Sequence, residues 1–331
     1  KNKKQKHIMK VVCIGNALVD KVCLLPNDDI LREENLPKGS MQLINSEESK
    51  RLKTRLEELK SEIATGGSAA NTANGIANLG VSTTYIGMVG NDELGDFYEK
   101  DMRENNISTH IFRSPDMATG LALALVSKDG ERTFATHLGA AVTLSADNIN
   151  ETLLEGYDYL HIEGYLISNN ELFNKIIDCA KKCGVKISID LASYNVVEEN
   201  LEYLKTVCKG VEIIFANEDE ARAFTQKDAE AALDEIAEYA NIAVVKIGAK
   251  GSLIKHNGQK MRIEETKRNK IDTTGAGDMY AGGFLAGLCK GEDLTKCGKL
   301  GSILAGNVIE IMGTKMDAQR WTKIEEEIAE L

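Results

Sequence analysis

Residues 271–278 read Ile271-Asp272-Thr273-Thr274-Gly275-Ala276-Gly277-Asp278 and run directly into the small and apolar stretch 279–288. The two glycines allow the backbone to turn tightly before a helix. The free N–H groups and the positive dipole end of that helix would point at whatever occupies the turn, which favours an anion. Asp278 would stand in the first helical turn, where an acidic residue also has a purely structural interpretation as a helix-start residue.

The turn matches neither of two common nucleotide-binding fingerprints. Tyr280 occupies the third glycine position of a Gly-x-Gly-x-x-Gly pattern, and the chain contains no Gly-x-x-x-x-Gly-Lys-Ser/Thr sequence. An NAD-dependent enzyme and a Walker-type phosphate loop are therefore disfavoured.

A second glycine-rich segment lies about 200 residues earlier. Gly66-Gly67-Ser68-Ala69-Ala70-Asn71-Thr72-Ala73-Asn74 leads into a helix-period pattern that ends at Leu79. Two adjacent glycines let a ligand approach the backbone closely, and Asn71 can both donate and accept hydrogen bonds at a hydroxyl. A helix start with small residues packed on a sheet would explain the same pattern without a ligand.

Around these segments the chain alternates apolar runs with helix-period stretches. The apolar runs are typical of buried strands and comprise 11–14, 84–89, 121–126, 157–162, 186–189, 211–215 and 242–247. The helix-period stretches comprise 47–60, 71–79, 94–105, 170–183, 229–239 and 278–289. This βαβ rhythm predicts an α/β fold with a doubly wound, mostly parallel sheet flanked by helices.

Two regions, at about 17–44 and 110–138, break this rhythm with short alternating segments and turn signals that are typical of β-ribbons. We expect them to form a small β-sheet lid inserted into a single domain that spans residues 10–331. Residues 1–9 are basic and polar, and we expect them to form a mobile leader.

Composition excludes several classes of function. With 51 acidic against 40 basic side chains, the formal charge of −11 opposes sequence-independent attraction to nucleic acid or anionic lipid. No stretch approaches the roughly 18–20 uninterrupted apolar residues of a membrane helix. The seven scattered cysteines form no Cys-x-x-Cys pair, which indicates free thiols rather than a disulfide framework or zinc site. We expect a cytoplasmic protein, monomeric or homodimeric, with a small-molecule substrate and no nucleic-acid or membrane partner.

Taken together and in this order, the two glycine-rich segments resemble the two signatures of the ribokinase-like (PfkB) family of carbohydrate and nucleoside kinases. The similarity extends over nearly the whole chain from about residue 10 and includes 86–95, 217–220 and 246–251. The resemblance implies an ATP-dependent phosphotransferase with an α/β core and a β-lid, which agrees with the fold predicted from the rhythm.

The resemblance also implies roles for the residues of the C-terminal turn. Asp278 would be the base that accepts the proton of the attacking hydroxyl. The N–H groups of Gly275, Ala276 and Gly277 would form an anion hole for the transferring phosphoryl group.

Two metal positions follow from the same resemblance. Asn217 and Glu220 match the family's Asn-x-x-Glu, which helps to place Mg²⁺ and phosphate, with Glu220 acting through water. From the residues alone they would be an acidic helix cap. Asp272 and Thr274 match positions that ligate a monovalent cation in potassium-activated members, with the remaining oxygens expected from 309–314. The sequence therefore leaves a K⁺ site open.

Four further residues fall where the family binds its nucleotide: Lys246, Gly248, Gly251 and Asn307. Lys246 departs from the small hydroxyl residue that is frequent at its position, which makes its contact with ATP the least supported of the four.

The acceptor side favours a nucleoside. Asp20, in the segment Gly15-Asn16-Ala17-Leu18-Val19-Asp20, matches the family residue whose single carboxylate accepts hydrogen bonds from two vicinal hydroxyls. This segment, together with 118–120, 131–141 and 217–221, is closer to the adenosine kinases of the family than to its ribokinases or fructokinases. The substrate-binding residues that the resemblance implies are Asn16, Asp20, Gly66, Gly67, Asn71, Phe134, Glu163 and Tyr165.

Tyr165 follows Glu163 in a stretch that carries aromatic residues against the purine in adenosine kinases, and Phe134 on the lid could cover the other face. Both aromatic residues would equally fit plain core packing. The sequence thus predicts an ATP-dependent kinase that phosphorylates the 5′-hydroxyl of adenosine to AMP.

Two alternatives stay open. A sugar kinase of the ribokinase or fructokinase type would need polar groups where a base would stack. A non-catalytic sensor of nucleosides or sugars could use the same fold, although Asp278 beside an intact Gly-Ala-Gly argues against it.

Overall fold

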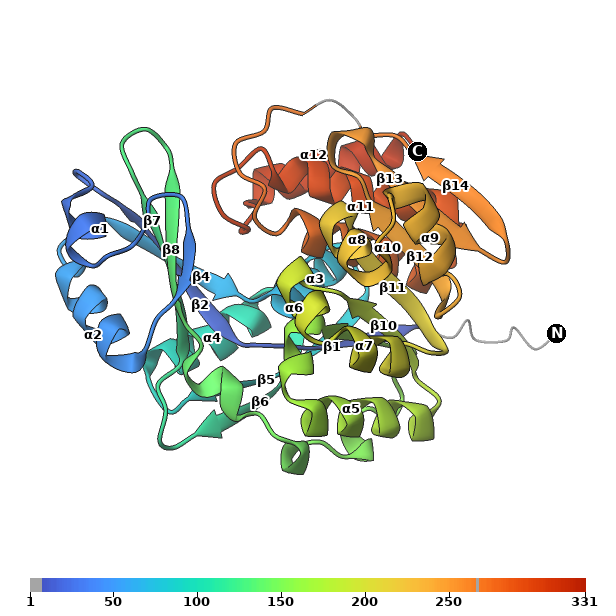
Figure 1. The fold of residues 1–331 in the computed structure, drawn as a ribbon, viewed down its shortest axis with the longest axis horizontal. Coiled ribbons are helices and arrows are strands. Elements are labelled where there is room, and N and C mark those ends of the chain that lie inside the picture. Colours follow the sequence, from blue (N-terminus) through green and yellow to red (C-terminus); the bar gives the residue numbers. More distant parts are fainter. Residues whose placement is uncertain (1–7, 266–267) are drawn as a thin grey trace.

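The computed structural model describes residues 8–265 and 268–331. Within these residues the strands form two sheets, a large one of nine strands and a small one of five (Figure 1). The expected leader at 1–9 lies outside the described residues except for Ile8 and Met9, which have no regular secondary structure. No helix of the part described is long and apolar enough to cross a bilayer.

The large sheet is mostly parallel, which confirms the predicted α/β fold class. Its strands, from one edge to the other, are β6 (Ile107–Ser114), β5 (Ser82–Gly90), β1 (Lys10–Ile14), β9 (Tyr159–Glu163), β10 (Lys186–Asp190), β11 (Val211–Asn217), β12 (Ala240–Lys246), β13 (Ser252–His256) and β14 (Gln259–Ile263). The pairs from β6 to β12 are parallel, and β13 and β14 are added antiparallel at one edge.

Helices cover both faces of the large sheet because successive strand residues alternate between two cores. In β1, Val11 and Cys13 belong to one buried cluster, and Val12 and Ile14 belong to the other. The first cluster is completed by α2 (Ser46–Arg55), α3 (Ser68–Asn78), α4 (Glu93–Glu104), α10 (Ala276–Lys290), α11 (Leu294–Val308) and α12 (Ala318–Ala329). The second is completed by α5 (Asn170–Cys183), α6 (Tyr194–Glu199), α7 (Leu201–Val207), α8 (Glu218–Thr225) and α9 (Ala229–Ile236).

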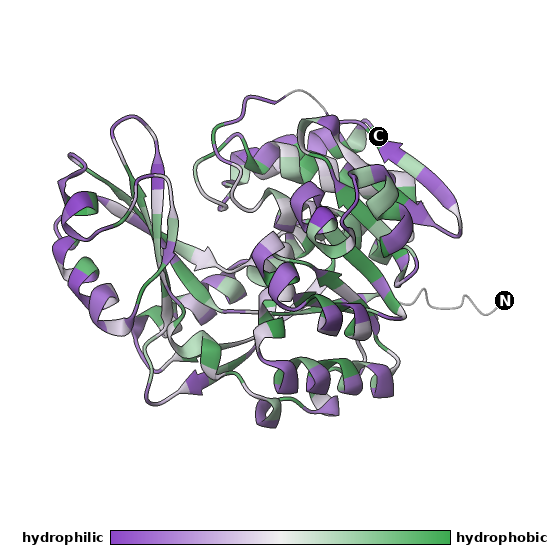
Figure 2. Cartoon of the chain, in the orientation of Figure 1, coloured by the Kyte–Doolittle hydropathy of each residue, from purple (hydrophilic) through white to green (hydrophobic). Residues whose placement is uncertain are grey.

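Figure 2 shows hydrophobic residues concentrated along the central strands and hydrophilic residues on the outward turns of helices such as α2 and α5. The chain therefore has the layered construction of a doubly wound domain.

The small sheet stands at one end of the large one (Figure 1). Its strands, in order, are β3 (Met41–Leu43), β8 (Arg132–His137), β7 (Gly120–Val126), β2 (Leu18–Leu24) and β4 (Ser61–Gly66), with α1 (Asp29–Glu33) between β2 and β3. Its function as a lid stays a prediction.

The bounds of the small sheet differ from the expected segments 17–44 and 110–138 in two ways. Strand β4 pairs with β2 although the apolar pattern gave no strand there, because an edge strand of a small sheet is mostly exposed and need not be apolar. Residues 110–114 belong to β6 in the large sheet. The apolar run 121–126, which looked like a core strand, is β7 of the small sheet and is buried along its whole length.

Candidate active site

The parallel strands bring five predicted or charged residues to one edge. Asn16 follows β1, and Glu163, Asp190, Asn217 and Lys246 are the last residues of β9, β10, β11 and β12. Strand β1 lies between β5 and β9, and the later strands are added on both sides of it, β5 and β6 on one side and β9 to β14 on the other. Crevices at the carboxyl ends of strands, where the strand order reverses, are where open α/β sheets bind ligands.

Helix α10 begins at Ala276, two residues before the expected helix-period stretch 278–289, and Asp278 stands in its first turn, as the sequence predicted. Gly275 caps the helix with φ of +74°, a conformation that side-chain-bearing residues rarely adopt. A Cβ on Gly275 would lie 2.6 Å from Cγ2 of Thr314. Glycine is therefore required at this position by both backbone angle and space.

The two glycine-rich segments meet at Asp278. The Ser68 hydroxyl donates to Oδ1 of Asp278 at 2.7 Å, and the Asn71 amide donates to Oδ2 at 2.8 Å. The Thr72 hydroxyl donates to the Asp278 carbonyl at 3.1 Å. Residues some 210 positions apart thus hold both carboxylate oxygens in place.

Burial raises the pKa of Asp278 from 3.8 to about 6. The hydrogen bonds from Asn71 and Ser68 oppose this rise, while the charge of Asp190 adds to it and the charge of Lys246 opposes it. A carboxylate in this range is ionised at pH 7 and is also a stronger base than an exposed aspartate, which suits a general base.

The proposed anion hole has fewer free N–H groups than the sequence indicated. The N–H of Ala276 donates to the Thr273 carbonyl at 3.2 Å, so it is already committed. Among the described residues, the N–H groups of Gly275 and Gly277 have no acceptor. The Lys246 ammonium lies 2.9 Å from where a Cβ on Gly277 would stand, so positive charge borders the turn.

Asp190 is a site residue that the sequence reasoning missed. The Lys246 ammonium donates to Oδ2 of Asp190 at 2.9 Å, and both side chains are largely buried. Burial alone would raise the pKa of Asp190 and lower that of Lys246; their mutual attraction reverses both directions. The position of Asp190 at the carboxyl end of a predicted strand was the available signal.

Glu220 extends this cluster. It is 3% exposed, and burial followed by the charge of Asp190 raises its pKa to about 7. It also forms a capping box: the Asn217 N–H and side-chain amide donate to its two carboxylate oxygens at 2.8 and 2.7 Å. The Glu220 N–H donates to Asn217 Oδ1 at 2.9 Å. The structure thus shows the helix-cap interpretation of this pair, and its role toward Mg²⁺ stays a prediction.

The carboxylates of Asp190, Glu220 and Asp278 fit a magnesium ion held mostly by phosphate oxygens and water. Their mutual repulsion raises the pKa values of Glu220 and Asp278, so a nearby cation would relieve it. No set of three or more His, Cys, Asp or Glu side chains in the described residues is arranged to hold a metal by itself. Mg²⁺ keeps several waters and shares phosphate oxygens in such sites, which agrees with the indirect role expected for Glu220.

On the acceptor side, Asp20 lies in β2 of the small sheet. Burial, followed by the charge of Asp278, raises the pKa of Asp20 to about 7, and the Arg132 charge opposes the rise. Asp20 and Asp278 therefore lie within electrostatic reach across the two parts of the molecule.

Gly66 and Gly67 allow the backbone between β4 and α3 to lie close to Asp20 and Asn16. A Cβ on Gly66 would lie 2.3 Å from Oδ1 of Asp20. Gly67 has φ of +98°, and a Cβ there would lie 2.1 Å from the Asn16 carbonyl oxygen. The glycine pair lets β4 and the start of α3 lie directly against Asp20 and Asn16.

Glu163 is 2% exposed, and both of its carboxylate oxygens accept hydrogen bonds from the protein. It accepts from the Asn16 amide at 2.9 Å and from the Ala69 N–H at 3.1 Å. Burial raises its pKa to about 7 despite these hydrogen bonds. Glu163 therefore orients Asn16 and the start of α3.

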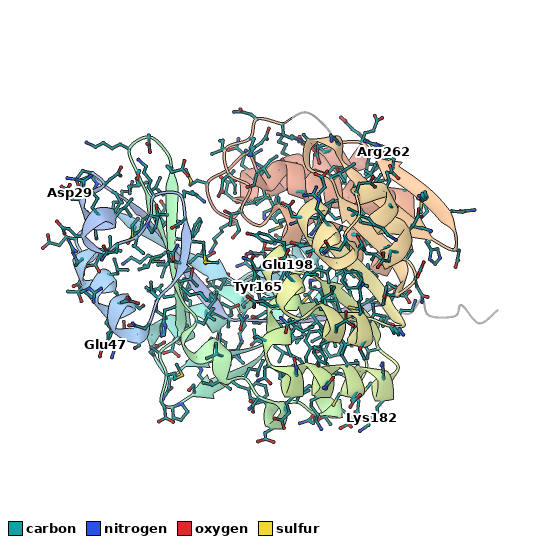
Figure 3. All side chains as sticks on the ribbon, viewed as in Figure 1. Asp29, Glu47, Tyr165, Lys182, Glu198 and Arg262 are labelled. Atoms are coloured by element: carbon teal, nitrogen blue, oxygen red, sulfur yellow. The ribbon has the colours of Figure 1, made fainter. Side chains whose placement is uncertain are left out.

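Tyr165 is exposed, with 39% of its surface accessible, and Figure 3 shows it between the small sheet and the C-terminal half. Its hydroxyl donates to the Ala192 carbonyl at 3.5 Å, and burial of the hydroxyl raises its pKa to about 12. Phe134 is half-buried on β8. Among the described residues, neither ring contacts another aromatic ring.

Of the predicted nucleotide residues, Gly248 and Gly251 form the turn between β12 and β13. Gly248 is exposed with φ of +56°. Gly251 has φ of +91°, and a Cβ there would lie 1.8 Å from the Ile263 carbonyl oxygen, so its packing alone requires glycine.

Asn307 is not brought to the surface of the site. It is fully buried in α11, and its amide donates to the Ile303 carbonyl at 3.0 Å and to Glu327 at 3.3 Å. The Arg320 guanidinium donates to its oxygen at 3.4 Å. In this structure Asn307 fastens α11 to α12 and has no group free for a nucleotide.

Asp272 and Thr274, the predicted cation ligands, are hydrogen-bonded to each other, and Asp272 is also paired with Arg132. The Thr274 N–H and hydroxyl donate to Oδ1 of Asp272 at 3.1 and 2.8 Å. The Gly313 N–H donates to Oδ2 of Asp272 at 2.9 Å. Nη1 of Arg132, on β8, donates to the same oxygen. Nε and Nη2 of Arg132 are buried and have no partner among the described residues. Arg132 is a second residue that the sequence reasoning missed, since it stood only within a matched stretch.

Comparisons with known proteins agree with the fold and identify the family. The sequence pattern of the pfkB family carbohydrate kinases matches residues 39–320. The crystal structure of a probable sugar kinase from Rhizobium etli CFN 42 is 32% identical, with a TM-score of 0.85, and the match covers 97% of this chain and 98% of that one. The adenosine kinase from Sinorhizobium meliloti is 31% identical, with a TM-score of 0.84, covering 97% and 100%.

A relative of similar identity is a nucleoside kinase from Methanocaldococcus jannaschii. It is 31% identical over 271 residues, which are 80% of this chain and 85% of the relative.

Proposed function

The chain belongs to the pfkB family of carbohydrate kinases, and on that premise we propose that it transfers the γ-phosphoryl group of ATP to the 5′-hydroxyl of adenosine, giving AMP and ADP. The observation that carries the proposal is the Asp278 carboxylate, held by Ser68 and Asn71 at the start of α10 beside the free N–H groups of Gly275 and Gly277. A base and an anion-binding turn on one helix terminus are what phosphoryl transfer to an alcohol requires.

In the reaction, the acceptor hydroxyl oxygen forms a bond to the γ-phosphorus and its proton passes to Asp278. The bond between the γ-phosphorus and the bridging oxygen breaks, and ADP leaves with the electron pair. Gly275 and Gly277 donate N–H groups to the transferring phosphoryl oxygens, where negative charge is concentrated. Mg²⁺, when bound with ATP, supplies charge neutralisation at the phosphates, and Glu220 would hold its water shell.

Lys246 adds a fixed positive charge at this turn. Its pairing with Asp190 holds the ammonium beside Gly277, close to the expected path of the phosphoryl group. An alcohol is a weak nucleophile, so alignment and charge stabilisation contribute most of the rate enhancement.

The charges around the acceptor position favour a neutral acceptor. Burial raises the pKa values of Asp20 and Glu163, and the charge of Asp278 raises both further. A phosphorylated acceptor would add a dianion to three carboxylates. A ribose diol instead supplies two hydroxyl donors to Asp20.

Adenosine rather than a free sugar is supported by the aromatic side chains and by the relatives. The rings of Tyr165 and Phe134 have no aromatic partner among the described residues, and a purine stacks well on such rings. Two of the relatives are an adenosine kinase and a nucleoside kinase. A sugar kinase is the second candidate, because the probable sugar kinase from Rhizobium etli is as similar as either of these.

The test is an ADP-release assay with ATP and Mg²⁺ against adenosine, inosine, guanosine, ribose, fructose and fructose 6-phosphate. Adenosine should give the highest kcat/KM, and the phosphorylated sugar should be inert. Turnover of ribose or fructose with inert adenosine would show that the acceptor is a sugar. No turnover with any alcohol would favour a non-catalytic sensor.

A further inference from the structure

Arg132 and Asp272 form an ion pair between the small sheet and the turn that precedes α10. Arg132 is the first residue of β8, opposite Val126 of β7. Nη1 of Arg132 donates to Oδ2 of Asp272, and the side chains are only 11% and 8% exposed. Asp272 stands three residues before Gly275, whose N–H has no acceptor among the described residues.

The oxygens that a potassium ion would use are already committed to donors. A carboxylate offers about four lone-pair positions, and Asp272 receives four hydrogen bonds, from Arg132, Gly313 and twice from Thr274. The Thr274 hydroxyl is a donor in this arrangement. The Ile309 carbonyl lies in the segment 309–314, from which further cation ligands were expected. It accepts hydrogen bonds from the Ile271 and Asp272 N–H groups at 2.8 and 3.1 Å.

These residues therefore do not fit a bound monovalent cation. A cation needs oxygens whose lone pairs face it, whereas here the lone pairs of Asp272 face N–H and O–H groups. The positive charge that a buried carboxylate requires is already present, because a guanidinium stays protonated at every physiological pH.

We propose that the Arg132 guanidinium is the built-in cation of the Asp272 carboxylate, so that the small sheet, rather than a potassium ion, positions the anion-hole turn. Arg132 acts through Asp272: it fixes the carboxylate, and the carboxylate fixes the N–H and hydroxyl of Thr274 immediately before Gly275. Arg132 is thus a positioning residue for the turn. This inference rests on the proposed phosphoryl-transfer function of that turn.

The same guanidinium also lies near both the acceptor-binding residue Asp20 and the turn that would bind the phosphoryl group. Its charge opposes the rise in the pKa of Asp20, so it lies within electrostatic reach of the acceptor carboxylate as well as of the turn. A displacement of the small sheet would withdraw the charge from Asp272 and loosen the turn. The position of the sheet over the acceptor would then be coupled to the readiness of the phosphoryl site.

The first test replaces the monovalent cation. ADP release and thermal unfolding are measured in KCl and in tetramethylammonium chloride at the same concentration of about 100 mM, so that ionic strength is constant. A protein that binds no potassium should change by less than about twofold in kcat/KM and about 1 °C in Tm. Activation by K⁺ of about fivefold or more, or a Tm that rises with K⁺ concentration, would overturn the proposal.

The second test is a double-mutant cycle on Arg132→Met and Asp272→Asn, which isolates the coupling between the two residues. Each single variant should lower kcat by at least about tenfold with little change in the KM for the acceptor, because the turn is loosened. When Asp272→Asn is already present, adding Arg132→Met should lower kcat by less than about a further twofold. Losses that multiply instead would show that Arg132 acts on something other than Asp272.

Arg113→Met is the matched control. Arg113 also forms two ion pairs, with Asp96 and Glu99 at 2.8 Å, but lies on β6 away from the predicted site residues. It should lower stability without changing kcat or the response to potassium. The Tm arm of the first test needs no substrate, so failure of the proposed function and failure of this inference are distinguishable.

Discussion

Replacing the carboxylate of Asp278 by an amide should separate catalysis from stability. Asp278→Asn keeps the size of the side chain and the turn at Gly275–Gly277 but removes the base. Loss of general-base assistance should lower kcat by about 10²- to 10⁴-fold, whereas the KM for ATP should change little. Single-turnover measurements show whether slow product release hides part of the effect.

The same substitution should make the folded protein more stable at neutral pH. The pKa of Asp278 in the folded protein is about 6 against 3.8 for an unperturbed aspartate. A difference of about two pKa units means that the ionised form costs the folded state up to about 3 kcal/mol, less where water reaches the group. An asparagine carries no such cost, and Ser68 and Asn71 can still hydrogen-bond to it after small rotations.

The direction of the pKa shift of Asp278 also predicts how this stability difference changes with pH. Because the folded pKa is raised, the folded protein holds the proton of Asp278 more tightly, and the stability contributed by this group falls as pH rises from about 4 to 6. The stability gain of Asp278→Asn should be largest at pH 7.5 and about half as large at pH 5.

Urea unfolding at the two pH values measures this gain, and ADP release measures the loss of activity. Ser68→Ala serves as a control, since it removes one hydrogen bond and keeps the base. A variant within about threefold of the original kcat in single turnover, or one less stable than the original at pH 7.5, would refute the reasoning.

Three further predictions concern the surroundings of Asp278. Asp20→Asn should lower kcat/KM for adenosine by about 10- to 100-fold and leave 2′-deoxyadenosine much less affected, as steady-state kinetics with both nucleosides would show; equal losses would remove the diol role. Gly67→Ala should destabilise the protein by about 3 kcal/mol or more in urea unfolding, because of the positive φ and the overlap with the Asn16 carbonyl; a loss below about 1 kcal/mol would contradict this. Lys246→Met should cost about 3–5 kcal/mol at pH 8 and less at pH 5, since it leaves Asp190 buried and unpaired. Adding Asp190→Asn should recover most of that loss, and no recovery would mean that the ion pair is not the cause.

Local patterns predicted most of the large sheet and its helices. The apolar runs at 11–14, 186–189 and 211–215 lie within β1, β10 and β11, and the helix-period stretch 170–183 is α5. A strand buried on both faces must be apolar throughout, and a helix on a sheet must be apolar every third or fourth residue, so burial leaves a direct imprint on the sequence.

The failures occur where burial leaves no such imprint. Strand β4 is exposed at the edge of the small sheet, so its residues alternate weakly and gave no signal. Ala276 appeared free to bind an anion because its engagement by Thr273 depends on the shape of the turn. Asn307 appeared open to a nucleotide because the position of α12 against α11 is not encoded in either helix.

Local features of the sequence were enough to predict the fold class, a helix with Asp278 in its first turn, and the family to which the chain belongs, because glycine turns and hydrophobic periodicity are local properties. The arrangement of the charges, in contrast, depends on tertiary packing. Ser68 and Asn71 reach Asp278, Asp190 reaches Lys246, and Arg132 reaches Asp272, over separations of 210, 207, 56 and 140 residues. The pKa of a carboxylate depends on its burial and on the charges within a few ångströms of it, and those neighbours are chosen by the packing of the two sheets.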